Sequence, residues 1–289
     1  MATEAQDDRM PLWYHLQELR WRIIVWLLFF VVSFVVALVF QNELMWLVTL
    51  PHRKAAEGLL KSRGEEDYAV KVERAAEKLK ENDKELYEAL IALKDELKRR
   101  DPSRLAVLKY EEAFLSYMKI CLAAAFLISL PFGIYQLWRF VSAGLYSHEK
   151  KAIRTFLPFS FVLFVGGLVF GYFVLVPIGL RFLLAYGDPE TLAPFITLGF
   201  YLSFFTTIML ALGIVFQLPL VMLIIAAMGI VTVSWLKRIR PYFLVGAFII
   251  AAVFTPTTDG VTQTLLAIPL ILLFELGIIL VKMFVRREE

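Results

Sequence analysis

Six long apolar runs, separated by polar segments, dominate the pattern of hydrophobic and polar positions along the chain. They are roughly Ile23–Phe40, Ile120–Phe140, Phe156–Pro177, Leu198–Ile230, Tyr242–Phe254 and Thr262–Val281. The first run contains no charged residue, and none occurs between Glu190 and Lys237. About 20 apolar residues in a helix cross the hydrocarbon core of a bilayer, and lipid requires each span to pair its own backbone groups. The pattern therefore predicts an all-α integral membrane protein with six transmembrane helices.

The last two runs are short for membrane spans. A helix over Tyr242–Phe254 would be about 20 Å long, less than a normal bilayer needs, and Thr262–Val281 is interrupted by Glu275. Short spans are accommodated partly by local thinning of the bilayer. Prolines inside several runs also predict kinked helices. We therefore expect a concave bundle that is thin where its short fifth and sixth helices lie.

Basic residues gather in alternate loops between the predicted spans. They are Arg20 and Arg22 before the first span, Lys150, Lys151 and Arg154 between the second and third, Lys237, Arg238 and Arg240 between the fourth and fifth, and Lys282, Arg286 and Arg287 after the sixth. The short loop between the third and fourth spans carries Asp188 and Glu190, the one between the fifth and sixth carries Asp259, and both contain almost no base. Because basic loops stay on the cytoplasmic side, the pattern predicts six spans with both termini in the cytoplasm.

One segment, residues 53–109, does not fit a compact membrane bundle. It holds about half of the charged residues of the chain, and Val72, Leu79, Leu86 and Leu93 recur in it at seven-residue spacing. That spacing is typical of amphipathic, coiled-coil-like helices. We expect a helical hairpin on the outer side of a single membrane domain that comprises residues 1–289. A solvated decoration is favoured over a docking module, because loops tolerate such insertions.

Composition excludes several classes of function. The chain is 59% hydrophobic with a net charge of +3, and its bases are distributed as a topology signal and not as a nucleic-acid surface. Cys121 is the only cysteine, so there is neither an intrachain disulfide nor a cysteine metal site. Hydrolase, phosphate-binding-loop and dinucleotide-binding motifs are absent. The sequence predicts a protein that is not an enzyme and binds no cofactor.

Two carboxylates lie beside the membrane on the predicted cytoplasmic side. Glu18 precedes the first span, and Glu149 lies in the polar loop between the second and third spans. Carboxylates bind guanidinium groups by paired, charge-assisted hydrogen bonds. The two acids can therefore bind arginines of a partner, or they can pair with Arg20, Arg22 or Lys150 of their own chain; the residues alone leave both interpretations open.

Three further polar residues lie within or beside the later spans. Gln217 is deep in the fourth run, Glu275 interrupts the sixth, and Asp259 precedes the sixth on the outer side. Polar groups at membrane depth are costly and generally have a partner or face water. The set suggests either a path for protons or ions, or a polar interior that thins the membrane.

Four motifs resemble the TatC subunit of the twin-arginine translocase. They are HLQELRWR at His15–Arg22, AGLYSHEKK at Ala143–Lys151, RPYFLVGAF at Arg240–Phe248 and FTPTTDGVTQTLLAIPLILLFELG at Phe254–Gly277. They occur in the family's order and at matching topological positions. The resemblance covers most of Pro11–Val285 apart from the charged insert.

The resemblance implies a receptor in the bacterial or archaeal cytoplasmic membrane. Such a receptor recognises paired arginines of export signal peptides and forms homo- and hetero-oligomers with single-span TatA- and TatB-type proteins. Folded cargo then crosses, driven by the proton-motive force. Glu18 and Glu149 match the family acids proposed to hold the signal arginines, and Arg20 belongs to the same N-terminal motif as Glu18.

The later polar residues also have counterparts in the family. Asp259 matches an acid on the outer side and Glu275 an acid in the sixth span. Many members carry a glutamate where this chain has Gln217. An amide at that position can bind a polar residue of a partner helix, but it cannot carry a proton.

Two other functions compete with the receptor. A proton- or ion-coupled secondary transporter would use Glu275, Asp259 and Gln217, but the internal repeats common in transporters are not evident. An outward-facing sensor or scaffold would depend on the insert. The set of motifs favours the receptor, with the signal arginines at Glu18 and Glu149 and the apolar part of the signal along the concave face.

Overall fold

The computed structural model describes residues 12–62, 68–79, 84–99, 105–143, 147–185, 196–255 and 259–284, which are helical apart from short connections. The elements are α1 (Leu12–Val39), α2 (Gln41–Ser62), α3 (Tyr68–Leu79), α4 (Lys84–Arg99), α5 (Tyr110–Ala143), α6 (Ser147–Phe170), the π-helix η1 (Gly171–Leu175), α7 (Val176–Ala185), α8 (Leu198–Val215), α9 (Leu218–Ala227), α10 (Val233–Phe254) and α11 (Gly260–Phe284). Within these residues the extended pairing is a single β-bridge between Ala106 and Thr197.

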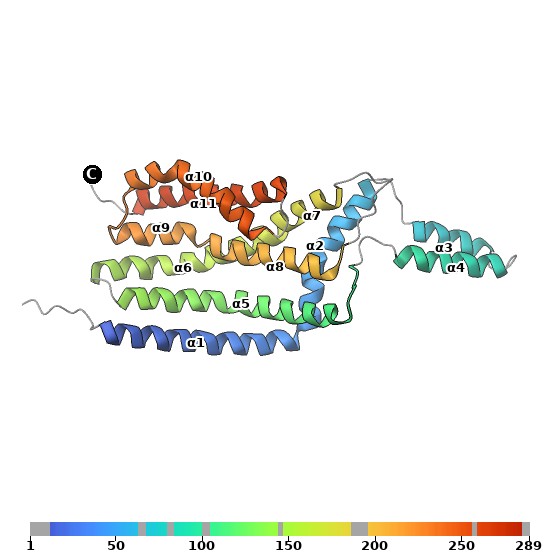
Figure 1. Cartoon of the computed structure of the whole chain (residues 1–289), viewed down its shortest axis with the longest axis horizontal. Helices are drawn as coiled ribbons and strands as arrows, with labels where there is room; N and C mark the ends of the chain where they lie inside the picture. Colours follow the sequence, from blue (N-terminus) through green and yellow to red (C-terminus); the bar gives the residue numbers. More distant parts are fainter. Residues whose placement is uncertain are drawn as a thin grey trace, which may run out of the picture.

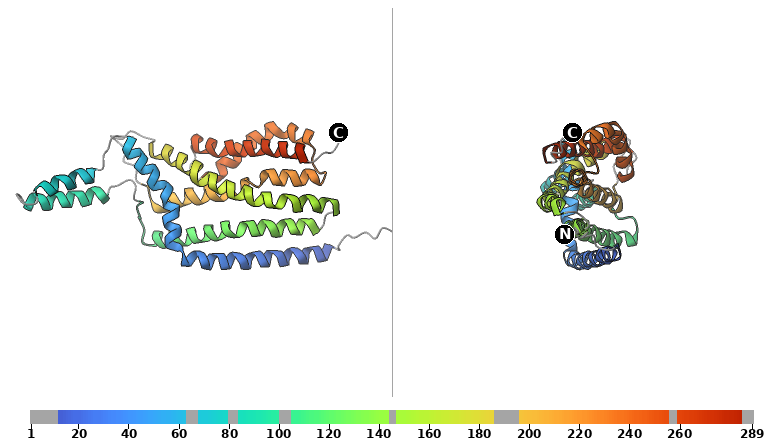
Figure 2. Two further views of the ribbon diagram at one scale, coloured as in Figure 1. Left: turned by 180° about the vertical axis from the view of Figure 1, so that it is seen from behind. Right: turned by 90° about the vertical axis from the view of Figure 1, so that its left-hand side faces the viewer.

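The long helices lie side by side in a row (Figures 1 and 2). The first helix, α1, forms one edge and packs on α5, which in turn contacts α6 and α8. The other edge is formed by α10 and α11, and α11 also packs on α9. One end of the row contains the starts of α1 and α6 and the ends of α5 and α11 (Figure 1). Helices α3 and α4 project from the opposite end.

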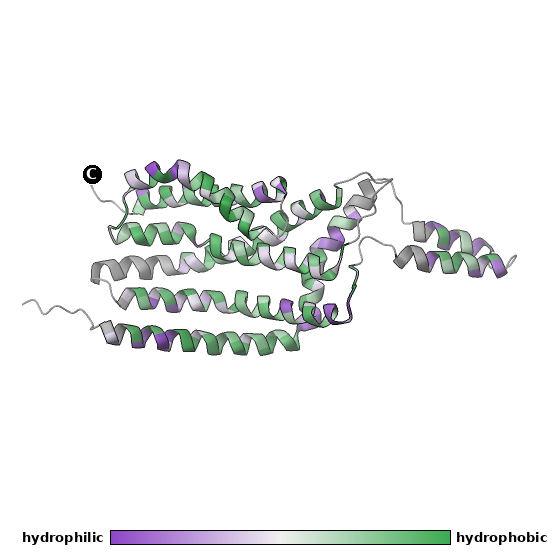
Figure 3. Ribbon diagram, in the orientation of Figure 1, coloured by the Kyte–Doolittle hydropathy of each residue, from purple (hydrophilic) through white to green (hydrophobic). Residues whose placement is uncertain are grey.

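Five stretches of the described residues are long and apolar enough to cross a membrane. They are Leu16–Val39, Tyr110–Ser142, Pro158–Ala185, Leu198–Ala227 and Gly260–Phe284. The predicted fifth span lies in α10, which is not among them because three basic residues occupy its first turns (Figure 3). The chain is therefore a multi-pass membrane protein, and a sixth crossing through α10 stays a prediction.

The sixth helix is longer than the apolar run Thr262–Val281 predicts. Helix α11 runs for 25 residues from Gly260 to Phe284, about 37 Å at the usual rise per residue. It extends past both ends of the apolar run because backbone hydrogen bonds do not require apolar side chains. Helix α10 has 22 residues, although its apolar part is confined to the second half. Both helices are nevertheless shorter than α1 and α5, which have 28 and 34 residues, and a thin end of the bundle stays a prediction.

Helix α8 supplies much of the buried core. Its largest fully buried side chains are Tyr201, Phe204, Leu202, Ile208 and Leu212. Gly167 of α6 and Gly171 of η1 allow close approach to this helix, since a Cβ atom on each would lie 2.7 Å from the side chains of Phe216 and Leu212, respectively. Helix α1, by contrast, leaves most of its apolar side chains exposed, as expected for a face in contact with lipid.

The charged insert begins inside a helix that belongs to the bundle. Helix α2 packs against α5 and α7, and Ala55 and Ala56 on it are buried. The following α3 and α4 pack against each other, with an ion pair between Glu73 and Lys94. Ala76 is buried in this pair, but Leu86 and Leu93 of the predicted seam are 43% and 46% exposed. The side chain of Leu79 lies outside the described residues.

Candidate functional site

The N-terminal acid of the predicted site lies one helical turn from an arginine. Glu18 and Arg22 are four residues apart on α1, a spacing that brings side chains together on one face. The Arg22 Nε donates a hydrogen bond to the Glu18 Oε1 over 3.1 Å, and the Nη2 of Arg22 donates to the same oxygen. The carboxylate therefore already binds a guanidinium group, which is one of the two arrangements that the sequence allowed.

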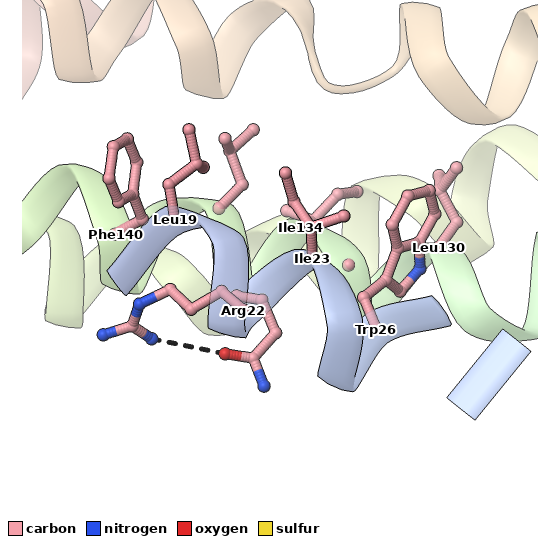
Figure 4. A pocket seen from close by; sticks show the side chains of 10 residues that line it. Leu19, Arg22, Ile23, Trp26, Leu130, Ile134 and Phe140 are labelled. Carbon is pink, nitrogen blue, oxygen red and sulfur yellow. Dashed lines mark hydrogen bonds between the residues drawn. The ribbon is translucent and has the colours of Figure 1, made fainter. Parts of the chain in front are cut away.

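The same guanidinium also reaches the neighbouring helix. The Nη1 of Arg22 donates a hydrogen bond to the amide oxygen of Gln136 on α5, over 3.2 Å (Figure 4). The Arg22 side chain is only 12% exposed and that of Glu18 is 26% exposed. The three residues thus form a partly buried polar cluster between α1 and α5, in which each group of the arginine fork has an oxygen acceptor.

An apolar cavity of about 300 Å³ adjoins this cluster. Its lining comes from α1 and α5: Leu19, Arg22, Ile23, Trp26, Leu130, Gly133, Ile134, Gln136, Leu137 and Phe140 (Figure 4). Trp26 closes part of the wall; its indole lies on Gly133, and its Nε1 donates to the backbone oxygen of Ser129 over 3.1 Å. The site therefore combines an anionic group with an adjoining apolar space.

The other predicted ligands of a signal peptide are placed less completely. Glu149 lies in the first turn of α6, which begins at Ser147, so it belongs to a helix and not to a loop. This turn is at the same end of the molecule as the start of α1 (Figure 1), but the Glu149 side chain lies outside the described residues. Arg20 is exposed on α1. The structure therefore places Glu18 and the backbone of Glu149 at one end, without bringing the two carboxylates into a described contact.

Gln217 has a partner within the protein. It is 8% exposed at the junction of α8 and α9. The Oγ of Ser160 donates to the Gln217 Oε1 over 2.5 Å, and the Gln217 Nε2 donates to the backbone oxygen of Ser160 over 3.1 Å. This reciprocal pair joins α6 to the break in the fourth span. It satisfies an amide that would otherwise be costly at membrane depth.

The two remaining acids also contact groups of their own chain. Glu275 on α11 forms an ion pair with Arg240 on α10. The Oδ1 of Asp259 accepts a hydrogen bond from the backbone N–H of Thr262 over 2.7 Å, as an N-terminal cap of α11. Each of these polar residues therefore has a structural role, and the three do not share a single described contact.

Sequence reasoning missed Gln136 and Ser160. Both lie inside long, mainly apolar segments, and their partners are 114 and 57 residues away in the chain. The only signal available was their polarity at membrane depth, which predicts a partner without identifying it.

Comparisons with known proteins converge on one family. The family described as Sec-independent protein translocase protein (TatC) matches residues 14–269. The TatC protein of Aquifex aeolicus (strain VF5) is 33% identical over 281 residues, which cover 97% of this chain and 98% of that one. The TatC protein of Desulforapulum autotrophicum is 31% identical over 284 residues, covering 98% and 88%. A crystal structure described as the twin arginine translocase receptor TatC is similar with a TM-score of 0.70 at 32% identity, covering 94% of this chain and 100% of that one.

Proposed function

This chain belongs to the TatC family of Sec-independent protein translocases, and on that premise we propose that it is a receptor for twin-arginine signal peptides. Proteins of this family are components of a protein translocase and are not enzymes. The proposed binding site lies at the end of the molecule where α1 and α6 begin. It comprises Glu18, Glu149 and Arg20.

The observation that carries the proposal is the guanidinium group bound to Glu18. Arg22 occupies this carboxylate with two of its nitrogens, so the local geometry accepts an arginine side chain. A partly buried carboxylate holds a planar guanidinium better than a compact ammonium, because only the guanidinium can donate through several parallel N–H groups. Glu149, whose backbone lies at the same end of the row of helices, is the second acid of the proposed site and would bind the second arginine through its side chain.

The remaining parts of the proposal concern orientation and partners. The distribution of the loop bases supports cytoplasmic termini, an orientation in which signal peptides meet Glu18 before they enter the membrane. Single-span TatA- and TatB-type proteins assemble with this chain, and the proton-motive force drives export of folded cargo. Because Gln217 is paired with Ser160, recruitment of a partner helix through Gln217 requires that pair to open.

The transporter alternative receives no comparable support. It needs Asp259, Gln217 and Glu275 to form a path for ions or protons. In the structure each of the three contacts a different neighbour: the backbone of Thr262, Ser160 and Arg240, respectively.

The test is binding of a twin-arginine signal peptide to the purified full-length protein in detergent, compared with a twin-lysine version of the same peptide. The wild-type protein should prefer the arginine peptide, and Glu18→Ala and Glu149→Ala should each remove most of this preference. Glu111→Ala is the matched control, because it removes an exposed carboxylate at the opposite end of α5. Equal binding of both peptides, unaffected by the two variants, would overturn the receptor assignment.

A further inference from the structure

The acid that the proposed function assigns to a signal arginine is already occupied in the structure. Its occupant is Arg22, one turn further along α1. We propose that Arg22 is an internal stand-in for the ligand, displaced when a signal arginine binds, and that Gln136 is part of the same guanidinium site. This inference rests on the proposed function and adds two residues to it.

The contacts of Arg22 show what a guanidinium experiences at this position. Its Nε and Nη2 are directed at Glu18 on α1, and its Nη1 is directed at the amide oxygen of Gln136 on α5. One planar group therefore satisfies acceptors from two helices at once. An incoming arginine that replaces Arg22 finds both acceptors already in place.

The site also has the space that an exchange requires. The cavity of about 300 Å³ is bounded by Arg22 and Gln136 themselves. Its other walls are apolar, which suits the methylene stem of an arginine and an apolar neighbour of that arginine in the peptide. Arg22 and Glu18 are four residues apart on one helix, and the described polar contacts of the Arg22 side chain are those with Glu18 and Gln136. A peptide arginine that offers the same donors to both acceptors can therefore compete with this one side chain.

The arrangement gives Gln136 a role in selectivity. An arginine that reaches Glu18 can also donate to Gln136, because its nitrogens are fixed in one plane. A lysine presents a single nitrogen on a flexible stem and does not reproduce this geometry. Gln136 is thus a specificity-determining residue, and its loss should reduce the affinity for arginine peptides more than the affinity for lysine peptides.

Competition by Arg22 has a measurable consequence. If a site is free for only a fraction of the time, its apparent affinity for the peptide is the intrinsic affinity multiplied by that fraction. If Arg22 occupies Glu18 for about 70–90% of the time, its removal should tighten peptide binding about three- to tenfold. Arg22→Gln is the variant, and the twin-arginine peptide is the probe, with the full-length protein in detergent. Arg22→Lys retains the charge but loses the fork, and its affinity should lie between those of wild type and Arg22→Gln.

Removal of a positive charge alone also favours a cationic peptide, so a charge-matched control is needed. Arg139→Gln makes the same change in charge on an exposed residue of α5, one turn beyond Gln136. It should alter the affinity less than twofold, an order-of-magnitude expectation for an exposed, screened charge. An equal increase in peptide affinity in Arg139→Gln and Arg22→Gln would show a general electrostatic effect. It would overturn the proposal that a signal arginine displaces Arg22.

The contribution of Gln136 is measured in the Arg22→Gln background, where Arg22 no longer competes. There, Gln136→Leu should weaken binding of the arginine peptide several-fold and leave the lysine peptide nearly unchanged. Equal losses of affinity for both peptides would show that Gln136 is not part of the guanidinium site.

The outcomes separate this inference from the proposed function. If Glu18→Ala abolishes discrimination while Arg22→Gln leaves affinity unchanged or weakens it, the receptor assignment stands and the exchange is wrong. If the wild-type protein binds both peptides equally, and neither Glu18→Ala nor Glu149→Ala changes this, the receptor assignment itself fails. Should Arg22→Gln fail to fold, Arg22→Lys decides: affinity above that of wild type supports the exchange, and equal or lower affinity overturns it.

Discussion

The carboxylate of Glu112, in the first turn of α5, accepts a hydrogen bond from the backbone N–H of Gly199, in the first turn of α8, with 2.8 Å between Oε1 and N. Its other oxygen accepts from the backbone N–H groups of Leu108, over 2.7 Å, and Lys109, over 3.4 Å. Beside this contact, the backbone of Ala106 pairs with the segment that precedes α8. One side chain thus joins the starts of two helices whose backbone donors have no partners within their own helix.

We therefore expect Glu112→Ala to destabilise the protein. The substitution leaves the backbone donors of Leu108, Lys109 and Gly199 without this acceptor, and it removes the side chain that joins the two helix starts. The measurement is the midpoint of thermal unfolding in detergent. Glu111→Ala is the control, because Glu111 is an exposed neighbour on the same turn. Equal midpoints for the two variants would contradict the prediction.

Gly133 should be essential for the wall of the cavity at the other end of α5. A Cβ atom at this position would lie 2.6 Å from the Nε1 of Trp26, and the same nitrogen donates to the backbone of Ser129. Gly133→Ala must therefore displace the indole ring, at a cost of about 1–3 kcal/mol for overpacking. Gly246→Ala on α10 meets nothing within 4 Å and should be neutral or stabilising. The comparison is again made by unfolding midpoints, and a stable Gly133→Ala would be evidence against this packing.

The pair formed by Gln217 and Ser160 should behave as a coupled unit. Ser160→Ala removes one of its two hydrogen bonds and Gln217→Leu removes both, with costs of about 1–3 kcal/mol for the buried groups left unsatisfied. The double variant should cost less than the sum of the two single variants, because no partner is then left behind. Strict additivity in this double-mutant cycle would show that the two side chains do not interact in the folded protein.

The same pair shows where prediction from the sequence succeeds and where it ends. The five apolar stretches could be found because a charge-free run such as Ile23–Phe40 has few alternatives to a membrane helix. The polarity of Gln217 at depth predicted that it needs a partner. It could not identify Ser160, because side chains 57 residues apart are brought together only by the packing of α6 against α9.

The candidate site could also be predicted only in part, because its local contact follows from the sequence and its contact between helices does not. Glu18 and Arg22 are four residues apart, so their contact is local and was one of the alternatives that the sequence left open. Gln136 is 114 residues from Arg22 and depends on the packing of α1 on α5. The seven-residue spacing in the insert predicted helices correctly, but it did not predict that Leu86 and Leu93 would be exposed, because spacing alone does not determine which face a partner helix covers.

The orientation of the chain in the membrane can be tested by labelling introduced cysteines, because the chain has a single cysteine of its own. Cys121 is the only cysteine in the sequence and is buried in α5, so the unmodified protein should react little with a maleimide that does not cross membranes. Lys78 on α3 and Lys237 on α10 are both exposed and lie at opposite ends of the molecule in Figure 1, where α3 projects and α10 begins. Each lysine can therefore be replaced by cysteine to report one side of the bilayer.

In intact spheroplasts, Lys78→Cys should be labelled at once, and Lys237→Cys only after the membrane is permeabilised. This result follows if the basic loops are cytoplasmic and the α3–α4 pair is outside. The reverse pattern would invert the topology and would place Glu18 where a cytoplasmic signal peptide could not reach it. Labelling of both variants from outside would instead mean that α10 begins on the same side as α3, and six alternating spans could not then be retained.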